Sequence, residues 1–331
     1  AKTLEKEGCR YFASAYIEEA MELRENGIRS PIIVLGVIPE EYVKEAANDK
    51  IEMSVSNYET AKKYGQIAFS EGKKLGVHIA ADVGMSRFGI TLENRMNEAI
   101  EEAEKIWSCE GIEVKGYISH MTVMSNEFER EFDYHQINLF REFTSKLYEK
   151  GYKAPRHCSC SAMTSLFPEA SMEYIRVGAL PFGLQNPLYR DFYTDEVIQL
   201  KTRVWNIKEV DFNTTVGYGP HYTKRKTRLA VIPVGFGDGL HRTLSDKAEV
   251  IINGKRAKIF GKICMDFTMV DITDIGEVNI GEVNIGDVVT LFGTDKNEHI
   301  SIKEYADLYG GTACEVSTSL GKRINRIYIN G

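Results

Sequence analysis

Residues 51–82 read IEMSVSNYETAKKYGQIAFSEGKKLGVHIAAD: an apolar run, a polar stretch with apolar residues at helical spacing, and a second apolar run. Two nearly continuous apolar runs joined by a helix predict neighbouring parallel strands. The same alternation recurs through the first half of the chain, with apolar runs at 10–15, 31–36, 51–56, 77–82, 114–120, 155–160 and 174–183. The sequence therefore predicts an α/β fold built on a parallel sheet.

A (β/α)8 barrel needs eight strands, and the runs above supply seven. AKTLEKEGC (1–9) has the pattern of a helix already under way, so we expect the first barrel strand to precede Ala1 and to be absent from this chain. A doubly wound sheet is the alternative. The barrel is favoured because no glycine-rich phosphate-binding fingerprint follows the early strands.

The texture changes near residue 190, which divides the predicted barrel (1–190) from a mostly β domain (191–331). Long Val/Ile-rich runs dominate the second part, and Asn253-Gly254 is a hairpin signal. Only ISIKEYADLYGG (300–311) has a helical pattern there. A direct repeat, IGEVN-IGEVN at 275–284, is interpreted as a lengthened surface loop.

Composition excludes several classes of protein. The 331 residues are 43% hydrophobic and 27% charged, as in ordinary globular proteins. The net charge is −7 and no basic block occurs, which excludes a dedicated nucleic-acid binder. No apolar run approaches the roughly 20 residues of a membrane helix, so a membrane contact is expected only if a further domain precedes Ala1.

The six cysteines are too sparse for a disulfide framework and predict reduced thiols in the cytoplasm. Cys158 and Cys160, which follow His157, could suggest a metal site. No second Cys/His pair lies at zinc-like spacing, so we expect no metal.

Polar side chains follow several of the predicted strands, where barrel enzymes build their active sites. Arg87 in ADVGMSRFG (81–89) could hold an anion, and His120 ends the strand VKGYISH (114–120) as a catalytic candidate. Each has a structural alternative: Arg87 as a surface residue of a turn, and His120 as a buried histidine bonded to a carbonyl.

Three later clusters also carry chemistry. Ser161 opens a helix and could bind phosphate or simply cap that helix. Arg176 precedes Gly178 and Ala179 at the position of barrel phosphate sites. Tyr218 lies between two glycines, which allow close approach, so it could act as a general base or be an ordinary hairpin aromatic.

The order of these clusters resembles that of the alanine racemases, which are fold-type III pyridoxal-phosphate enzymes. The similar segments are ADVGMSRFG, YISHM, HCSCSAM, YIRVGALPFG, VGYGPHY, IPVGFGDGLHR and ICMDFTMVD. They run in the same order along the whole chain, which makes a chance agreement negligible.

The resemblance implies that the barrel binds pyridoxal 5'-phosphate. It assigns the phosphate to Ser161 and to the backbone of Gly178 and Ala179, and the pyridine nitrogen to Arg176. Because an arginine keeps its proton, that nitrogen stays unprotonated, which favours reprotonation of Cα over transamination. Tyr218 would be one of two bases, with His120 tuning it.

The resemblance further implies that Tyr218, the Met265 backbone and the Asp266 side chain serve the active site of a partner subunit, which makes a homodimer obligatory.

The chain departs from the family pattern at several positions. The lysine that holds the cofactor belongs to the strand expected before Ala1, and Lys2 does not match it. Ala80 stands where the family often has a carbamylated lysine, and Cys160 where it has Asn before the phosphate serine. Phe236 and Cys314 replace two tyrosines near the substrate.

The expected activity is racemisation of a small amino acid by transfer of the Cα proton between two bases. Alanine is the first substrate, and serine a rival, because the vancomycin-resistance serine racemases resemble this family and also carry a smaller residue in place of the pocket tyrosine. The alternatives are a dedicated serine racemase and a non-catalytic, cofactor-binding relative. A barrel decarboxylase is disfavoured because it needs only one proton donor.

A first prediction concerns the cofactor lysine. Because no lysine of residues 1–331 matches the family position, we expect borohydride reduction of the cofactor-loaded protein to label none of them. Peptide mapping by mass spectrometry provides the measurement. A pyridoxyl group on any lysine of this chain would contradict the alignment of its first helix.

Overall fold

The computed structural model describes residues 1–331 except 124–129, 185–191, 276–281 and 330–331. It divides into two compact units, Ala1–Gly178 and Ala179–Asn330. Each unit has its own hydrophobic core, so each is described separately.

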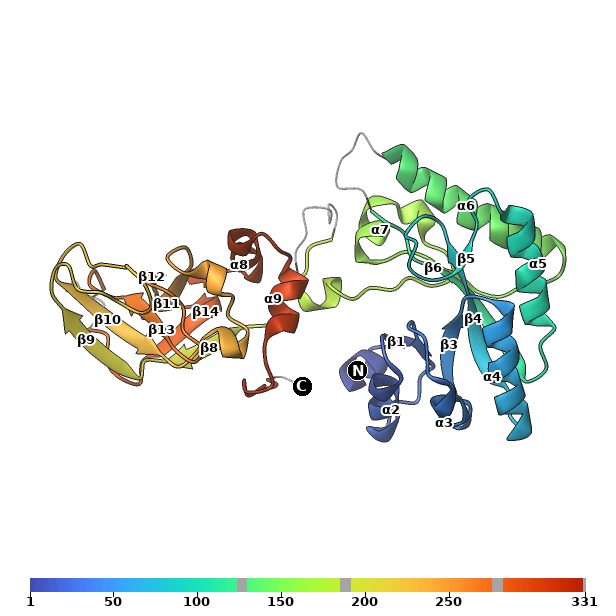
Figure 1. Cartoon of the computed structure of the whole chain (residues 1–331), viewed down its shortest axis with the longest axis horizontal. Coiled ribbons are helices and arrows are strands. Elements are labelled where there is room, and N and C mark those ends of the chain that lie inside the picture. The colour runs from blue at the N-terminus through green and yellow to red at the C-terminus, as the bar shows by residue number, and fades with distance from the viewer. Residues whose placement is uncertain (124–129, 185–191, 276–281, 330–331) are drawn as a thin grey trace. The chain divides into compact units, whose positions relative to one another are not determined.

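The first unit contains a parallel sheet that curls as a barrel wall does, with its helices outside the strands (Figure 1). The strand order is β1-β2-β3-β4-β6-β7, and β5 pairs with β4. The strands are β1 (Phe12–Ser14), β2 (Ile32–Val34), β3 (Ile51–Val55), β4 (Leu75–Asp82), β5 (Ile90–Thr91), β6 (Ile112–Ser119) and β7 (Arg156–His157). The α/β prediction is confirmed.

Most helices of this unit carry on one face the apolar residues that become buried, whereas α1 buries none. In α6, for example, Ile137, Phe140, Phe143 and Leu147 recur at helical spacing and are buried. The helices are α1 (Lys2–Lys6), α2 (Ile17–Glu25), α3 (Val43–Asn48), α4 (Tyr58–Ser70), α5 (Met96–Trp107), α6 (Arg130–Glu149) and α7 (Ser161–Leu166).

One predicted strand, residues 174–183, is wrong as a strand. In the structure this segment makes an isolated parallel bridge between Cys160 and Arg176 and then a 3-10 turn at Leu180–Phe182. The physical reason is Pro181, which has no N–H to donate, together with Gly183 in the left-handed region at φ 66°.

The second unit contains an antiparallel sheet of order β15-β14-β11-β12-β13-β10-β9, with β8 paired to β14. Its strands are β8 (Leu200–Arg203), β9 (Asn206–Val210), β10 (Thr227–Ile232), β11 (Glu249–Ile252), β12 (Lys255–Ile259), β13 (Thr268–Asp271), β14 (Val288–Asp295) and β15 (Glu298–Ile300). The hairpin prediction is confirmed: Asn253 at φ 54° and Gly254 at φ 77° join β11 to β12.

The described part of this unit has two α-helices where the sequence predicts one. The expected helix is α8 (Ile302–Tyr309). The second is α9 (Ala313–Ser319), a short Ser/Thr-rich segment with a weak apolar pattern. It is held by a capping box in which Thr312 accepts from the Glu315 N–H and the Glu315 carboxylate accepts from Thr312 N–H at 2.6 Å.

The structure says little about two expectations from the sequence, the surface loop at the IGEVN repeat and the membrane contact. Most of the IGEVN repeat lies outside the described residues, so its interpretation as a surface loop stays a prediction. Within the described part of the chain, the structure contains no helix long and apolar enough to cross a membrane.

Candidate active site

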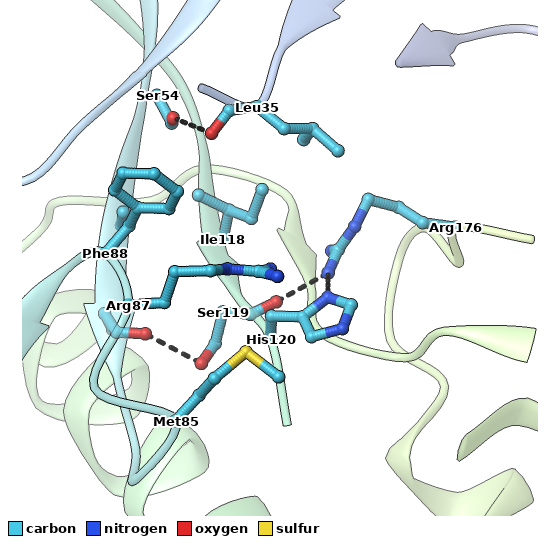
Figure 2. Close-up of a pocket in the computed structure, with 11 residues that line it drawn as sticks. Leu35, Ser54, Met85, Arg87, Phe88, Ile118, Ser119, His120 and Arg176 are labelled. Carbon is cyan, nitrogen blue, oxygen red and sulfur yellow. Dashed lines mark hydrogen bonds between the residues drawn. The ribbon is translucent and has the colours of Figure 1, made fainter. Parts of the chain in front are cut away.

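A pocket in the first unit gathers the candidate residues that follow β4 and β6 (Figure 2). Arg87, His120 and Arg176 line it, so the structure brings together three residues that lie far apart in the sequence. The two guanidinium groups reach toward the same space beside His120 (Figure 2). The other lining residues are uncharged: Leu35, Ser54, Ala80, Ala81, Met85, Phe88, Ile118 and Ser119.

The loop that carries Arg87 is shaped by Asp82 at the end of β4. The Asp82 Oδ1 accepts hydrogen bonds from the N–H groups of Gly84 and Ser86, both at 3.0 Å. Gly84 at φ 132° takes a conformation that favours glycine. Arg87 has no ion-pair or hydrogen-bond partner among the described residues, which leaves its charge available for an anion.

Arg176 is the most heavily bonded side chain of the pocket. Its Nη1 donates to His157 Nδ1 at 2.8 Å and to the His157 carbonyl at 2.9 Å. Its Nη2 donates to the Ser119 carbonyl at 2.6 Å and to His120 Nδ1 at 3.3 Å. These four bonds fix the plane of the guanidinium, and burial lowers its pKa.

His120 is held as an acceptor by this arrangement. Burial, followed by the charges of Arg176 and Arg87, lowers the pKa of His120 to about 4. The ring is therefore neutral at physiological pH, and its Nδ1 carries the lone pair that accepts from Arg176. Among the described residues, no hydrogen bond joins the His120 ring to a backbone carbonyl.

Two observations test whether these residues fit a ligand with an aromatic nitrogen and a phosphate. The Nε–H of Arg176 has no partner among the residues that the structure describes, so a half-buried donor is left over beside the pocket. A Cβ built on Gly178 meets nothing within 4 Å, so that backbone borders open space. A ring nitrogen fits the first feature, and the second leaves room for a bulky group such as a phosphate.

Ser161 and Gly178 meet although 17 residues separate them: the Gly178 N–H donates to Ser161 Oγ at 3.1 Å. Cys160, and not Ser161, is the N-cap of α7, and its side chain makes no capping bond. Ala179 follows Gly178 as the first residue of the second unit.

Tyr218 belongs to the second unit and lies on an exposed turn. Gly217 at φ 69° and Gly219 at φ 85° flank it in the left-handed region. A Cβ on Gly217 would lie 2.8 Å from the terminal methyl of Met269, a flexible group that can shift, so it is the backbone conformation that favours glycine here. The Tyr218 side chain is 64% exposed, which leaves its hydroxyl accessible to another chain.

Phe236, Met265 and Asp266 lie on two adjoining loops of the second unit. The Gly237 N–H donates to the Met265 carbonyl at 2.9 Å. Arg323 holds the two loops together, with 2.8 Å from Nη1 to Asp266 Oδ1 and 3.0 Å from Nη2 to Asp238 Oδ1. The sequence reasoning missed Arg323, because nothing in GKRINR (321–326) indicates which acidic groups it faces.

Cys314 is the second residue of α9 and is exposed in the second unit. Burial of part of the side chain, with the charge of Glu315, raises the pKa of its thiol. No hydrogen bond joins the Cys314 side chain to Phe236, Met265 or Asp266 among the described residues, and its place near a substrate stays a prediction.

The sequence reasoning also missed His78 and Glu52, and it considered the cluster at His157 only as a metal site. All three are buried in the first unit and bonded in series behind Arg176. The available signal was a polar residue inside an apolar strand, as in IEMSVS and VHIAAD. No group of three or more metal-binding side chains occurs in the described part of the chain.

Comparison with protein families gives a consistent result over the whole chain. Residues 1–186 match the family described as "Alanine racemase, N-terminal domain" and residues 197–328 match "Alanine racemase, C-terminal domain". The alanine racemase 2 of Caldanaerobacter subterraneus subsp. tengcongensis is 33% identical, over 99% of this chain and 84% of the relative.

Solved structures agree. The alanine racemase of Clostridium difficile 630 matches with a TM-score of 0.90 and 32% identity, over 99% of this chain and 84% of that one. The alanine racemase of Bartonella henselae, which contains covalently bound pyridoxal phosphate, matches with a TM-score of 0.82 and 26% identity, over 98% and 87% of the two chains.

The lowered pKa of His120 predicts a pH dependence of stability. The folded value of about 4 lies below the ordinary value of 6.5, so between these values the unfolded chain binds the proton and the folded chain does not. Stability contributed by neutral His120 is therefore lost as the pH falls from about 6.5 toward 4, by at most about 1.4 kcal/mol per pH unit.

The measurement is urea unfolding at several pH values for the wild type and for His120→Gln. The variant should lose less stability over this range, with His135→Gln, which removes an exposed histidine of α6 that pairs with Glu93 at 2.6 Å, as the control for removing a histidine outside the pocket. Identical pH slopes for the wild type and His120→Gln would show that folding does not depress this pKa.

Proposed function

The chain belongs to the alanine racemase family and is an amino-acid racemase, and from this premise we propose that it interconverts L- and D-alanine with pyridoxal 5'-phosphate by moving the Cα proton between two bases. The observation that carries the proposal is the guanidinium of Arg176. Four of its N–H groups are committed to protein acceptors, and the fifth is left for a ligand beside a cationic pocket.

When bound, pyridoxal phosphate supplies the electron sink that makes the Cα proton of an amino acid acidic. The chain's own residues would hold and orient it. Arg176 would donate its Nε–H to the ring nitrogen, and the open backbone at Gly178 and Ala179, with Ser161, would receive the phosphate. Because Arg176 is always a donor, the ring nitrogen keeps its lone pair and carries no proton.

Arg87 and His120 complete the proposed site on the barrel side. Arg87 has no counter-charge among the described residues and would attract the anionic groups of cofactor and substrate. His120, neutral and held by Arg176, would accept or donate a hydrogen bond without adding a third positive charge. The pocket therefore favours an anion with a planar ring.

Tyr218 is proposed as one of the two bases, accepting the Cα proton at its Oη on one face of the substrate. Its exposure and its two flanking left-handed glycines support close approach to a ligand held by another chain. The proposal includes a homodimer in which Tyr218, the Met265 backbone and Asp266 serve the partner's site. Arg323 would orient Asp266 for that role.

We also propose that serine is accepted beside alanine. Cys314 and Phe236 stand where the resemblance places two tyrosines near the substrate. Phe236 lacks the tyrosine hydroxyl, and Cys314 lacks the whole ring.

The six cysteines are free thiols, which supports a reducing compartment such as the cytoplasm.

The experiment that tests the proposal uses the full-length protein loaded with pyridoxal phosphate. We expect L-alanine and D-alanine to interconvert to an equal mixture. Chiral chromatography measures the two enantiomers over time. An absorbance change on cofactor binding that Arg176→Ala weakens would support the site assignment. A protein that binds the cofactor and leaves both enantiomers unchanged would overturn the proposed function.

A prediction for Tyr218 follows from the two-base scheme. Tyr218→Phe should lower racemisation by roughly 10²–10⁴-fold, the usual contribution of a positioned general base. Exchange of the Cα proton in deuterated water should persist for one enantiomer only, because the other base still acts. Tyr222→Phe, an exposed tyrosine of the same turn, is the matched control and should retain full activity.

A prediction for Cys314 follows from the size of the replaced ring. A pocket discriminates one small group by about 1–3 kcal/mol, so the wild type should turn over both alanine and serine. Cys314→Tyr should depress serine turnover, whereas Cys314→Ser should not. The measurement is kcat/KM for both amino acids. If the wild type and Cys314→Tyr reject serine equally, Cys314 does not face the substrate.

A further inference from the structure

A series of four hydrogen bonds, the central two of them buried, runs behind Arg176 in the first unit. Nη1 of Arg176 lies 2.8 Å from His157 Nδ1, and His157 Nε2 lies 2.8 Å from His78 Nδ1. His78 Nε2 lies 2.8 Å from Glu52 Oε2, which also accepts from the Tyr11 hydroxyl at 2.8 Å. These hydrogen bonds link Tyr11, β3, β4, β7 and the segment after α7.

The direction of every bond follows from the two ends of the series, where the Arg176 guanidinium can only donate and the Glu52 carboxylate can only accept. A guanidinium can only donate, so His157 Nδ1 must be an acceptor and its proton must lie on Nε2. His157 then donates to His78 Nδ1, whose own proton must lie on Nε2. His78 finally donates to Glu52. A proton added to either ring would place two donors face to face and break a bond.

Burial makes a broken bond in this chain expensive. His78 is 1%, His157 3% and Glu52 8% exposed. An unpaired polar group at such a depth costs the full desolvation penalty. Burial, with His78 and Arg176 as further causes, lowers the pKa of His157 well below its ordinary range, which agrees with a neutral ring.

Two strand glycines make room for this chain. A Cβ on Gly116 would lie 2.3 Å from His78 Nδ1, and one on Gly76 would lie 2.9 Å from the Glu52 Cγ. Neither glycine has a left-handed φ, so backbone conformation does not explain them. Glycine in a strand interior weakens the strand and often marks a close approach, here of the His78 and Glu52 side chains.

The Tyr11 hydroxyl lies at the other end of this series of hydrogen bonds. Its hydroxyl lies 3.1 Å from Oε1 and 2.8 Å from Oε2 of Glu52. Burial, and then the charge of Glu52, raises the pKa of Tyr11, so this hydroxyl stays a donor. Glu52 is thus surrounded by donors and is the acceptor on which the whole series ends.

We propose that Glu52 is a positioning residue of the racemase. As the terminal acceptor of the Arg176–His157–His78 series, it holds both imidazoles in the Nε2–H tautomer. The Arg176 guanidinium is thereby kept in the plane in which its Nε–H is presented to the cofactor ring. The proposal rests on the proposed function for its last step. The tautomers of His78 and His157 depend on the protein alone and not on a bound cofactor.

Nitrogen-15 NMR of the histidine rings in the full-length protein without added cofactor tests the tautomer step. In the wild type, both His78 and His157 should carry their proton on Nε2, with assignments from His78→Gln and His157→Gln. Glu52→Gln keeps an acceptor oxygen and should preserve both tautomers. Glu52→Leu removes the acceptor and should convert at least one ring to the Nδ1–H form or to a mixture.

The wild-type spectrum alone can overturn the proposal, whether or not the variants fold. An Nδ1–H or doubly protonated ring at either histidine would break the deduced direction. Unchanged tautomers in a folded Glu52→Leu protein, with circular dichroism as the check of folding, would show that Glu52 does not lock them.

Kinetics then test the effect on Arg176. A misplacement of about 1 Å costs on the order of 10²-fold, so Glu52→Leu should lower kcat/KM for alanine by about that factor while Glu52→Gln retains most of it. Equal loss in both variants would make charge, and not tautomer, the determinant and would overturn the proposal. A wild type with the deduced tautomers and no racemase activity would instead contradict the proposed function alone.

Discussion

The guanidinium of Arg176 is the interaction on which the first unit's site depends. Its donors reach the ends of two strands, at Ser119 on β6 and His157 on β7, and also the His120 ring. The segment that carries Arg176 has only an isolated bridge to its neighbour, so side-chain bonds replace the ladder that a full strand would provide. One side chain therefore both completes the wall of the sheet and lines the pocket.

This double role has an electrostatic consequence. Arg176 uses four N–H groups on neutral acceptors, and the nearest carboxylate in its hydrogen-bonded series, Glu52, lies beyond two imidazoles. Arg87 has no counter-charge in the described residues, and His120 is neutral. The pocket keeps its positive potential because its cations are oriented by groups that do not neutralise them, which suits an anionic ligand.

The elements with strong periodicity could be predicted from the sequence, and so could three residues that line one pocket. The parallel strands, α6 and the Asn253-Gly254 turn follow from local patterns, and Arg87, His120 and Arg176 converge as expected. Residues 174–183 are apolar enough to resemble a strand, and Pro181 is the residue in this segment that argues against one. The bonding of His78 to Glu52 depends on strand register, which places β4 between β3 and β6, and no local pattern encodes a register.

Register also explains how one sheet holds a polar series and an apolar pocket floor. Side chains two apart in a strand share a face, so His78 and Ala80 point to the same side of β4. Ala80 packs with Ile33 and Ile118 in a small apolar cluster that borders the pocket, one layer above the His78–Glu52 bond. Among the described residues, the hydrogen bonds that connect the pocket with His78 and Glu52 run through Arg176 and His157. The Ala80 side chain carries no polar atom, so it adds to this apolar cluster and offers no hydrogen-bond partner to Arg87, which lines the same pocket.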